Sequence, residues 1–315
     1  MQGRRMKRMG LLAAGMLAAA LVRGGEIKHR FLVSDFMNRS VHYVDQEDAS
    51  KNWTLNLPEL AMDLQLVGGN RLLCNRSKGY DVYDLATRAK ADSFQSAALN
   101  GVRSVRRLAD GRTFLGTEGG AVYEFDAQKR LTATYAMPKA IRYVRMMRFT
   151  PKGTLLLAAE DGAYEVSLAK GLEAEQRLVR KFALPRPRNA YMALYAPDGN
   201  LLLSGGYSKG LYTFDAGGRL LKDTVLKQPD GLNNYFYAGF QILKNGNLVM
   251  SNWTGHGVKD FKPGWKLAEL DKDRNVVWTW NEAFGGTVNQ VIVLDGLDTG
   301  VLHDDASGIL GPAAK

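Results

Sequence analysis

Cysteine is almost absent from this sequence, since Cys74 is alone among 315 residues. One thiol cannot form an internal disulfide, so a hydrophobic core must hold the fold together, and the chain is long enough to bury one. Because Cys74 stands in an apolar stretch, RLLCN, we expect a buried and unreactive thiol. Its distance from the N-terminus also excludes a lipoprotein anchor.

Recognisable catalytic motifs are also missing. The sequence has no nucleophile elbow, no paired-histidine metal motif and no phosphate-binding loop, and it contains only four histidines. No basic stretch interleaved with aromatics is present, so we expect no nucleic-acid partner. The net charge of +10 includes five basic residues before position 24, and removing those five leaves about +5. Such a charge is ordinary for a secreted domain.

A long apolar run is missing too. The run near the start, residues 10–22, spans 13 positions and follows a basic segment with four Arg or Lys residues. This arrangement predicts a secretory signal peptide over residues 1–25, with an N-terminal membrane anchor as the alternative. We therefore expect a periplasmic or secreted protein, a monomer, with no membrane span after cleavage.

Helical periodicity of 3.6 residues is lacking, and a longer repeat takes its place. Five glycines, each followed by an apolar stretch, recur at intervals of 42, 42, 46 and 47 residues: Gly69, Gly111, Gly153, Gly199 and Gly246. A polar loop, a second apolar stretch and, in most copies, an aspartate that opens a turn come next. Repeats of about 40–50 residues with four short strands are typical of β-propeller blades.

The two ends of the chain supply the remaining blade. Residues 30–35, 40–45 and 52–57 look like the second, third and fourth strands of a blade that lacks its first, and residues 289–296 look like that first strand. Pairing the ends completes a sixth blade and leaves no long unpaired sheet edge. We therefore predict an all-β fold, a six-bladed β-propeller over residues 26–300 closed by N-terminal strands and a C-terminal strand in one blade. A partly disordered tail is expected at 301–315.

Three repeats share a further pattern: VYEFDAQKRL, LYTFDAGGRLL and KLAELDKDRNVVWTW. Each places an aromatic or apolar strand before an aspartate, a polar turn and another apolar stretch. This pattern resembles the quinoprotein-type (PQQ-like) bacterial β-propeller repeat, and the resemblance covers residues 29–296. It implies the propeller fold. Quinone-dependent dehydrogenases of that kind carry a vicinal disulfide, which one cysteine cannot form, and this speaks against PQQ as a cofactor.

A propeller sorts its loops by face. Loops from the second to the third strand, and connections from one blade to the next, lie on the face of the central funnel, whereas the Gly and Asp turns lie on the other face. Two long stretches, residues 227–240 and 252–265, reach the funnel face. Long loops on a rigid scaffold tend to carry function.

The two stretches combine aromatic and amide side chains, which recognise sugars through ring stacking and paired hydrogen bonds. A loop folded on its own aromatics is the alternative. The candidate ligand-binding residues here are Asn233, Tyr235, Tyr237, Trp253 and His256, together with Tyr191 on the inner strand of the fifth blade. His256 is also the candidate catalytic base.

Arginines recur at equivalent positions on the innermost strands of the third and fourth blades. Arg103 corresponds to Arg145, and Arg106 corresponds to Arg148. A guanidinium group that faces the funnel can pair with a carboxylate or a sulfate. These four arginines therefore predict an anionic ligand.

A cation site is a further hypothesis. Asp35, Asn75 and Asn252 end the second strands of three neighbouring blades. Their oxygens suit a hard divalent cation such as Ca²⁺, while capping of the strand ends by the same side chains is the alternative. Apart from such a cation we expect no cofactor.

Together these features predict a secreted propeller that binds a polar small molecule, anionic or carbohydrate, in its funnel. Unrelated functions share the propeller fold. A lyase, hydrolase or lactonase that acts on such a ligand is therefore one alternative, and a protein-interaction scaffold is another.

Overall fold

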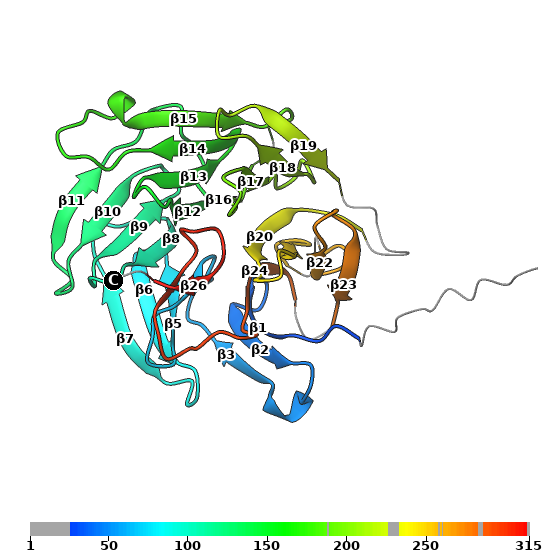
Figure 1. Ribbon diagram of the computed structural model, residues 1–315. Helices are drawn as coiled ribbons and strands as arrows, with labels where there is room; N and C mark the ends of the chain where they lie inside the picture. The colour runs from blue at the N-terminus through cyan, green and yellow to red at the C-terminus, as the bar shows by residue number, and fades with distance from the viewer. Residues whose placement is uncertain are drawn as a thin grey trace, which may run out of the picture.

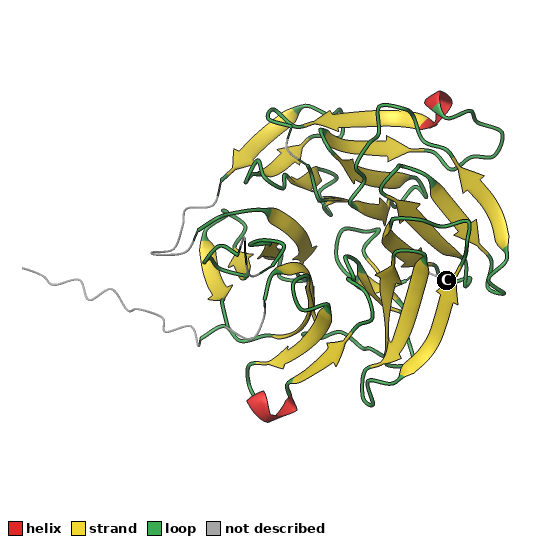
Figure 2. Cartoon of the chain, turned by 180° about the vertical axis from the view of Figure 1, so that it is seen from behind, coloured by secondary structure: helices red, strands yellow, loops and turns green. Residues whose placement is uncertain are grey.

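The computed structural model describes residues 26–187, 189–225, 233–257, 259, 261–282 and 286–313. The predicted signal peptide lies outside these residues. Within them, no helix is both long and apolar enough to cross a membrane. The helical segments are two single 3-10 turns, Ala49–Lys51 and Glu175–Arg177, at the outer rim (Figure 2).

Six antiparallel sheets of four strands surround a central axis, which confirms the predicted six-bladed β-propeller (Figure 1). Each blade is given from the axis outward. Blade 1 contains β24 (Val288–Val293), β1 (Arg30–Asp35), β2 (Ser40–Asp45) and β3 (Trp53–Asn56). Blade 2 contains β4 (Leu64–Leu66), β5 (Arg71–Arg76), β6 (Gly79–Asp84) and β7 (Lys90–Gln95). Blade 3 contains β8 (Val102–Arg107), β9 (Thr113–Thr117), β10 (Val122–Phe125) and β11 (Leu131–Tyr135).

The other three blades repeat this order. Blade 4 contains β12 (Met146–Phe149), β13 (Leu155–Ala159), β14 (Gly162–Val166) and β15 (Leu178–Ala183). Blade 5 contains β16 (Met192–Tyr195), β17 (Leu201–Ser204), β18 (Leu211–Phe214) and β19 (Leu220–Thr224). Blade 6 contains β20 (Tyr237–Ile242), β21 (Leu248–Asn252), β22 (Leu267–Leu270) and β23 (Val276–Trp280).

The two ends of the chain close the ring as predicted. β24 pairs antiparallel with β1, with Phe31 opposite Val293 and Val33 opposite Val291. All four of these side chains are buried, so the closing sheet has a dry core like the other blades. The closure positions the innermost strand of blade 1, and therefore its residues at the funnel.

The repeated turns form for local reasons. Each of the five repeated glycines lies between the first and second strands of its blade, with φ between +59° and +85°. Only glycine adopts this left-handed conformation without a steric cost. The repeated aspartates accept backbone N–H groups of the following turn, as Asp84 does from Ala86 and Thr87. Both features lie on the face opposite the funnel.

The C-terminal segment differs from the prediction of partial disorder, at least as far as residue 313. Its short strands β25 (His303–Asp304) and β26 (Gly311–Pro312) form a hairpin that lies across the middle of the ring (Figure 1). Leu302 bridges to Val67 of blade 2, and Ile309 bridges to Ile242 of blade 6. The segment therefore covers the bore on the face opposite the funnel.

The core fills the spaces between adjacent blades. Aromatic rings meet edge to face there, as Phe182 does with Phe214 at 5.7 Å between ring centroids. Cys74 lies within such a cluster on β5, fully buried, and burial raises the pKa of its thiol. The prediction that this thiol is buried is confirmed.

Candidate functional site

A cavity of about 280 Å³ lies at the centre of the face where the blades begin. Each innermost strand supplies one lining residue, located within two positions of the start of that strand. In blade order these residues are Asn289, Met62, Arg103, Arg145, Tyr191 and Phe236. At its innermost strand, every blade therefore contributes one residue to the wall of this cavity, which is the predicted central funnel.

The loops from the second to the third strand complete the funnel wall. Blade 1 contributes Phe36, blade 3 Glu118, blade 5 Tyr207, and blade 6 both Trp253 and His256. These loops lie on the same face as the starts of the innermost strands, which is the assignment made from the sequence. Long and short loops alike reach the cavity.

One side of the funnel is charged. Arg103 Nη2 lies 2.7 Å from Glu118 Oε2, and Arg145 Nη1 lies 2.7 Å from Glu118 Oε1. Burial alone would raise the pKa of Glu118, but the hydrogen bonds and charges of the two arginines outweigh it and lower the pKa. Two cations and one anion leave a net charge of one positive unit on this wall.

Glu118 does not saturate the two guanidinium groups. Each arginine donates to it through one terminal nitrogen, whereas a guanidinium carries five N–H donors. The side chains of Arg103 and Arg145 are 29% and 21% exposed. The wall can therefore accept a second carboxylate without breaking the ion pairs already present.

The other side of the funnel is aromatic. Trp253 meets Phe236 at 5.4 Å and Phe36 at 5.5 Å between centroids, both edge to face. Its ring also meets His256 at 4.5 Å, and Tyr207 meets Phe236 at 4.7 Å. Such edge contacts fix the orientation of each ring. The result is a rigid apolar wall opposite the arginines.

Tyr191 and Asn289 lie between these two walls. The Tyr191 hydroxyl accepts a hydrogen bond from Asn289 Nδ2 at 3.1 Å. Burial, together with the charge of Asp63, raises the pKa of Tyr191, so its hydroxyl stays protonated at neutral pH. Tyr191 is therefore suited to hydrogen bonding and not to acting as a base.

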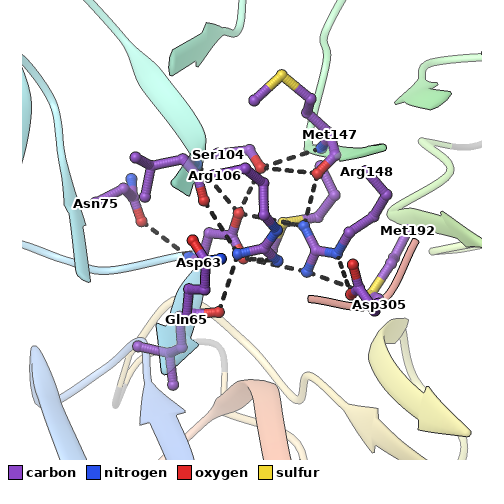
Figure 3. Close-up of polar contacts among 12 residues, drawn as sticks. Asp63, Gln65, Asn75, Ser104, Arg106, Met147, Arg148, Met192 and Asp305 are labelled. Atoms are coloured by element: carbon purple, nitrogen blue, oxygen red, sulfur yellow. Dashed lines mark hydrogen bonds and ion pairs between the residues drawn. The ribbon is translucent and has the colours of Figure 1, made fainter. Parts of the chain in front are cut away.

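An ion-pair network lies in the bore next to the funnel (Figure 3). Asp63, fully buried, accepts from Arg106 Nη2 at 2.7 Å and from Arg148 Nη2 at 3.1 Å. Arg148 Nε also lies 2.7 Å from Asp305 of the C-terminal segment. The part of the bore beside Arg106, Arg148 and Asp305 holds a space of only about 30 Å³, so the network closes the base of the funnel.

The four predicted arginines thus divide into two pairs. Arg103 and Arg145 line the funnel, whereas Arg106 and Arg148 are 5% and 1% exposed and belong to the buried network. Three residues along a strand correspond to about 10 Å, so the second pair lies that much deeper in the bore. The expectation that all four face the funnel is corrected on this ground.

The predicted aromatic and amide residues also divide. Tyr191, Trp253 and His256 line the funnel. Tyr237 is fully buried against Trp265 within blade 6, and Tyr235 packs behind Trp253 at 6.1 Å between centroids. Asn233 is exposed and donates to the backbone oxygen of Pro263. These three are outside the lining, because only the residue next to the start of β20 reaches the cavity.

The three candidate cation ligands share a structural role. Each accepts hydrogen bonds from the two backbone N–H groups that directly precede the innermost strand of its own blade. Asp35 accepts from Gly286 and Thr287, Asn75 from Met62 and Asp63, and Asn252 from Tyr235 and Phe236. This is the capping role that the sequence left as the alternative. Among the described residues, no group of three or more His, Cys, Asp or Glu side chains is placed to hold a metal ion.

The sequence does not single out several of the lining residues. Asn289, Met62 and Phe36 come from the closing blade and its neighbour, and Tyr207 comes from a short glycine-rich loop. Aligning the starts of the innermost strands would have found Asn289 and Met62, since one residue from that place in every blade reaches the funnel. The loop residues carry no comparable signal.

Similar solved structures support the propeller fold, whereas the comparisons of sequence find no match. No family model matches the chain, and no curated protein matches it. Among solved structures, a protein of unknown function from Bacteroides caccae has a TM-score of 0.68 at 16% identity, covering 85% of this chain and 99% of that one.

Two further similar structures are named for an activity or a fold. A catalytically inactive virginiamycin B lyase from Staphylococcus aureus, determined with quinupristin, has a TM-score of 0.57 at 10% identity, covering 80% of this chain and 83% of that one. The WD40 β-propeller domain of Doa1 has a TM-score of 0.53 at 12% identity and covers 70% of each chain. At these identities the likeness establishes the fold alone. The propeller fold is confirmed, whereas no comparison confirms the PQQ-like family.

Proposed function

We propose that this chain is a secreted or periplasmic propeller whose funnel binds a small anionic molecule. The proposal rests on one observation: two partly exposed arginines on one wall, Arg103 and Arg145, share a single carboxylate and keep donors for another. The basic residues and the apolar run before position 26 support the location.

The size of the cavity limits the ligand. Sites for drug-sized ligands occupy roughly 300–1,000 Å³, and the funnel, at about 280 Å³, is slightly smaller than that range. A molecule of about the size of one sugar ring fits it. The aromatic wall would pack against the apolar face of such a ring, while the arginines hold its carboxylate.

Replacing Arg145 with alanine is expected to weaken binding of glucuronate by about tenfold to a hundredfold, because a hydrogen bond to a charged group contributes about 1.5–3 kcal/mol. Binding of the neutral analogue glucose should change much less. Isothermal titration calorimetry measures both. The matched control is Arg142→Ala, which removes an exposed arginine from the same connection outside the funnel lining. Equal losses for the acid and the neutral sugar would contradict the charged wall.

A lyase is the second candidate function, and His256 is the observation that favours it. This histidine is exposed at the funnel, in edge contact with Trp253 at 4.5 Å and Phe36 at 5.7 Å. A structural neighbour is a lyase by name. If the protein converts a bound acid to a product, and His256→Ala abolishes this conversion, the protein is an enzyme. Binding without conversion supports the first proposal.

A further inference from the structure

Besides Nε of Arg103, two polar atoms of the funnel residues have no partner in the part of the chain that the structure describes. They are the indole Nε1 of Trp253 and the side-chain Oδ1 of Asn289. Trp253 is 6% exposed and Asn289 is 1% exposed, and both line the cavity. Buried polar groups in folded proteins almost always have a partner, so these two indicate where a ligand or water binds.

Both atoms are held in place by their neighbours. Asn289 donates through Nδ2 to the Tyr191 hydroxyl at 3.1 Å, which directs Oδ1 away from that partner. Phe236 and Phe36 fix the Trp253 ring by edge contacts. The residues that line the funnel therefore carry one unpaired donor and one unpaired acceptor, besides the guanidinium groups.

The two atoms discriminate between classes of anion. An indole N–H only donates, and an amide oxygen only accepts. Sulfate carries no proton at neutral pH, so its oxygens would satisfy the donor and leave the acceptor unpaired. An apolar acid such as a fatty or benzoic acid would leave both unpaired. A hydroxyl group accepts and donates, so a hydroxylated acid satisfies the whole lining.

We infer that the funnel selects a sugar acid, with its carboxylate at Arg103 and Arg145 and its ring hydroxyls at Trp253 and Asn289. The inference rests on the proposed function and narrows it to one substrate class. A pyranose ring fits both the volume of about 280 Å³ and the aromatic wall. Trp253 and Asn289 are then specificity-determining residues.

The test compares three probes by calorimetry: glucuronate, cyclohexanecarboxylate, which keeps the ring and the charge, and glucose, which keeps the hydroxyls. We expect the wild-type protein to bind glucuronate at least about tenfold more tightly than either analogue. Trp253→Phe, which keeps the ring and removes the N–H group, should weaken glucuronate about tenfold and leave cyclohexanecarboxylate unchanged. Asn289→Leu should act in the same direction.

The matched control is Trp280→Phe, which removes an indole N–H group from a buried tryptophan outside the funnel lining. It should not alter the affinity for any probe. If cyclohexanecarboxylate binds as tightly as glucuronate, and both depend on Arg145, the sugar-acid inference is overturned while the proposed function stands. If neither acid binds, the proposed function fails and the inference fails with it. Urea unfolding of each variant separates lost affinity from lost folding.

Discussion

Replacing Asp63 with asparagine is expected to lower the free energy of unfolding by about 3–5 kcal/mol, the cost of removing one partner from a buried ion pair. Asp63 is fully buried and accepts from Arg106 and Arg148, as well as from Ser104 and Val105. Asparagine keeps the shape but not the charge. Two buried cations would then share the single carboxylate of Asp305, which pairs with Arg148.

Urea unfolding monitored by tryptophan fluorescence measures the loss, provided that the m-value is unchanged. The matched control is the exposed Asp273→Ala, for which a change within about 0.5 kcal/mol is expected. A double-mutant cycle sharpens the test. Arg106→Met removes the surplus cation, so it should cost less in the Asp63→Asn background than in the wild type. Equal costs in both backgrounds would show that the network is not coupled.

The second large effect concerns pH and the closure of the ring. His29 Nδ1 lies 2.6 Å from Asp295 Oδ2, and Nε2 lies 2.8 Å from Glu269 Oε2. Both ring nitrogens face carboxylates, and only the doubly protonated imidazolium can donate to both. Burial alone would lower the pKa of His29, but these hydrogen bonds and charges outweigh it and raise the pKa to about 9.

A raised histidine pKa stabilises the folded state at low pH. The contribution is fully present below the unfolded value of 6.5 and is lost as pH rises through about 9. A shift of this size corresponds to about 3 kcal/mol between pH 6 and pH 9. Urea unfolding across that interval should show that the free energy of unfolding of the wild type declines with pH, whereas that of His29→Gln does not. The comparison stops at pH 9, because the buried thiol of Cys74 adds a slope of the same sign above it. A wild-type curve parallel to that of the variant would contradict this assignment.

The fold follows from local chemistry, which explains how far the sequence predicts it. A glycine at positive φ and an aspartate that caps its own turn act within a few residues, so their spacing displays the blades directly. The closing sheet likewise pairs two continuous apolar runs, Phe31–Val33 of β1 and Val291–Val293 of β24. The C-terminal hairpin has no such signal. Its position depends on the distant contacts of Asp305 with Arg148 and of Leu302 with Val67.

The site is predicted in part, for a related reason. The sequence identifies Arg103 and Arg145 because they occupy equivalent places in two repeats. It groups Arg106 and Arg148 with them, because repeat alignment shows which residues are equivalent but not how deep they lie in the bore. The sequence does not single out Asn289, because the repeats are aligned on their turn glycines and not on the starts of the innermost strands. Its importance becomes visible only when its unpaired oxygen is seen beside Tyr191.

The central claim is that the funnel holds an acid between its charged and aromatic walls. A crystal structure of the protein soaked with glucuronate tests it most directly. The account predicts the carboxylate within hydrogen-bonding distance of Arg103 and Arg145, with ring hydroxyls at Trp253 Nε1 and Asn289 Oδ1. An empty funnel, or a sugar bound only in the groove of about 720 Å³ on the opposite face beside Ser307, would contradict it.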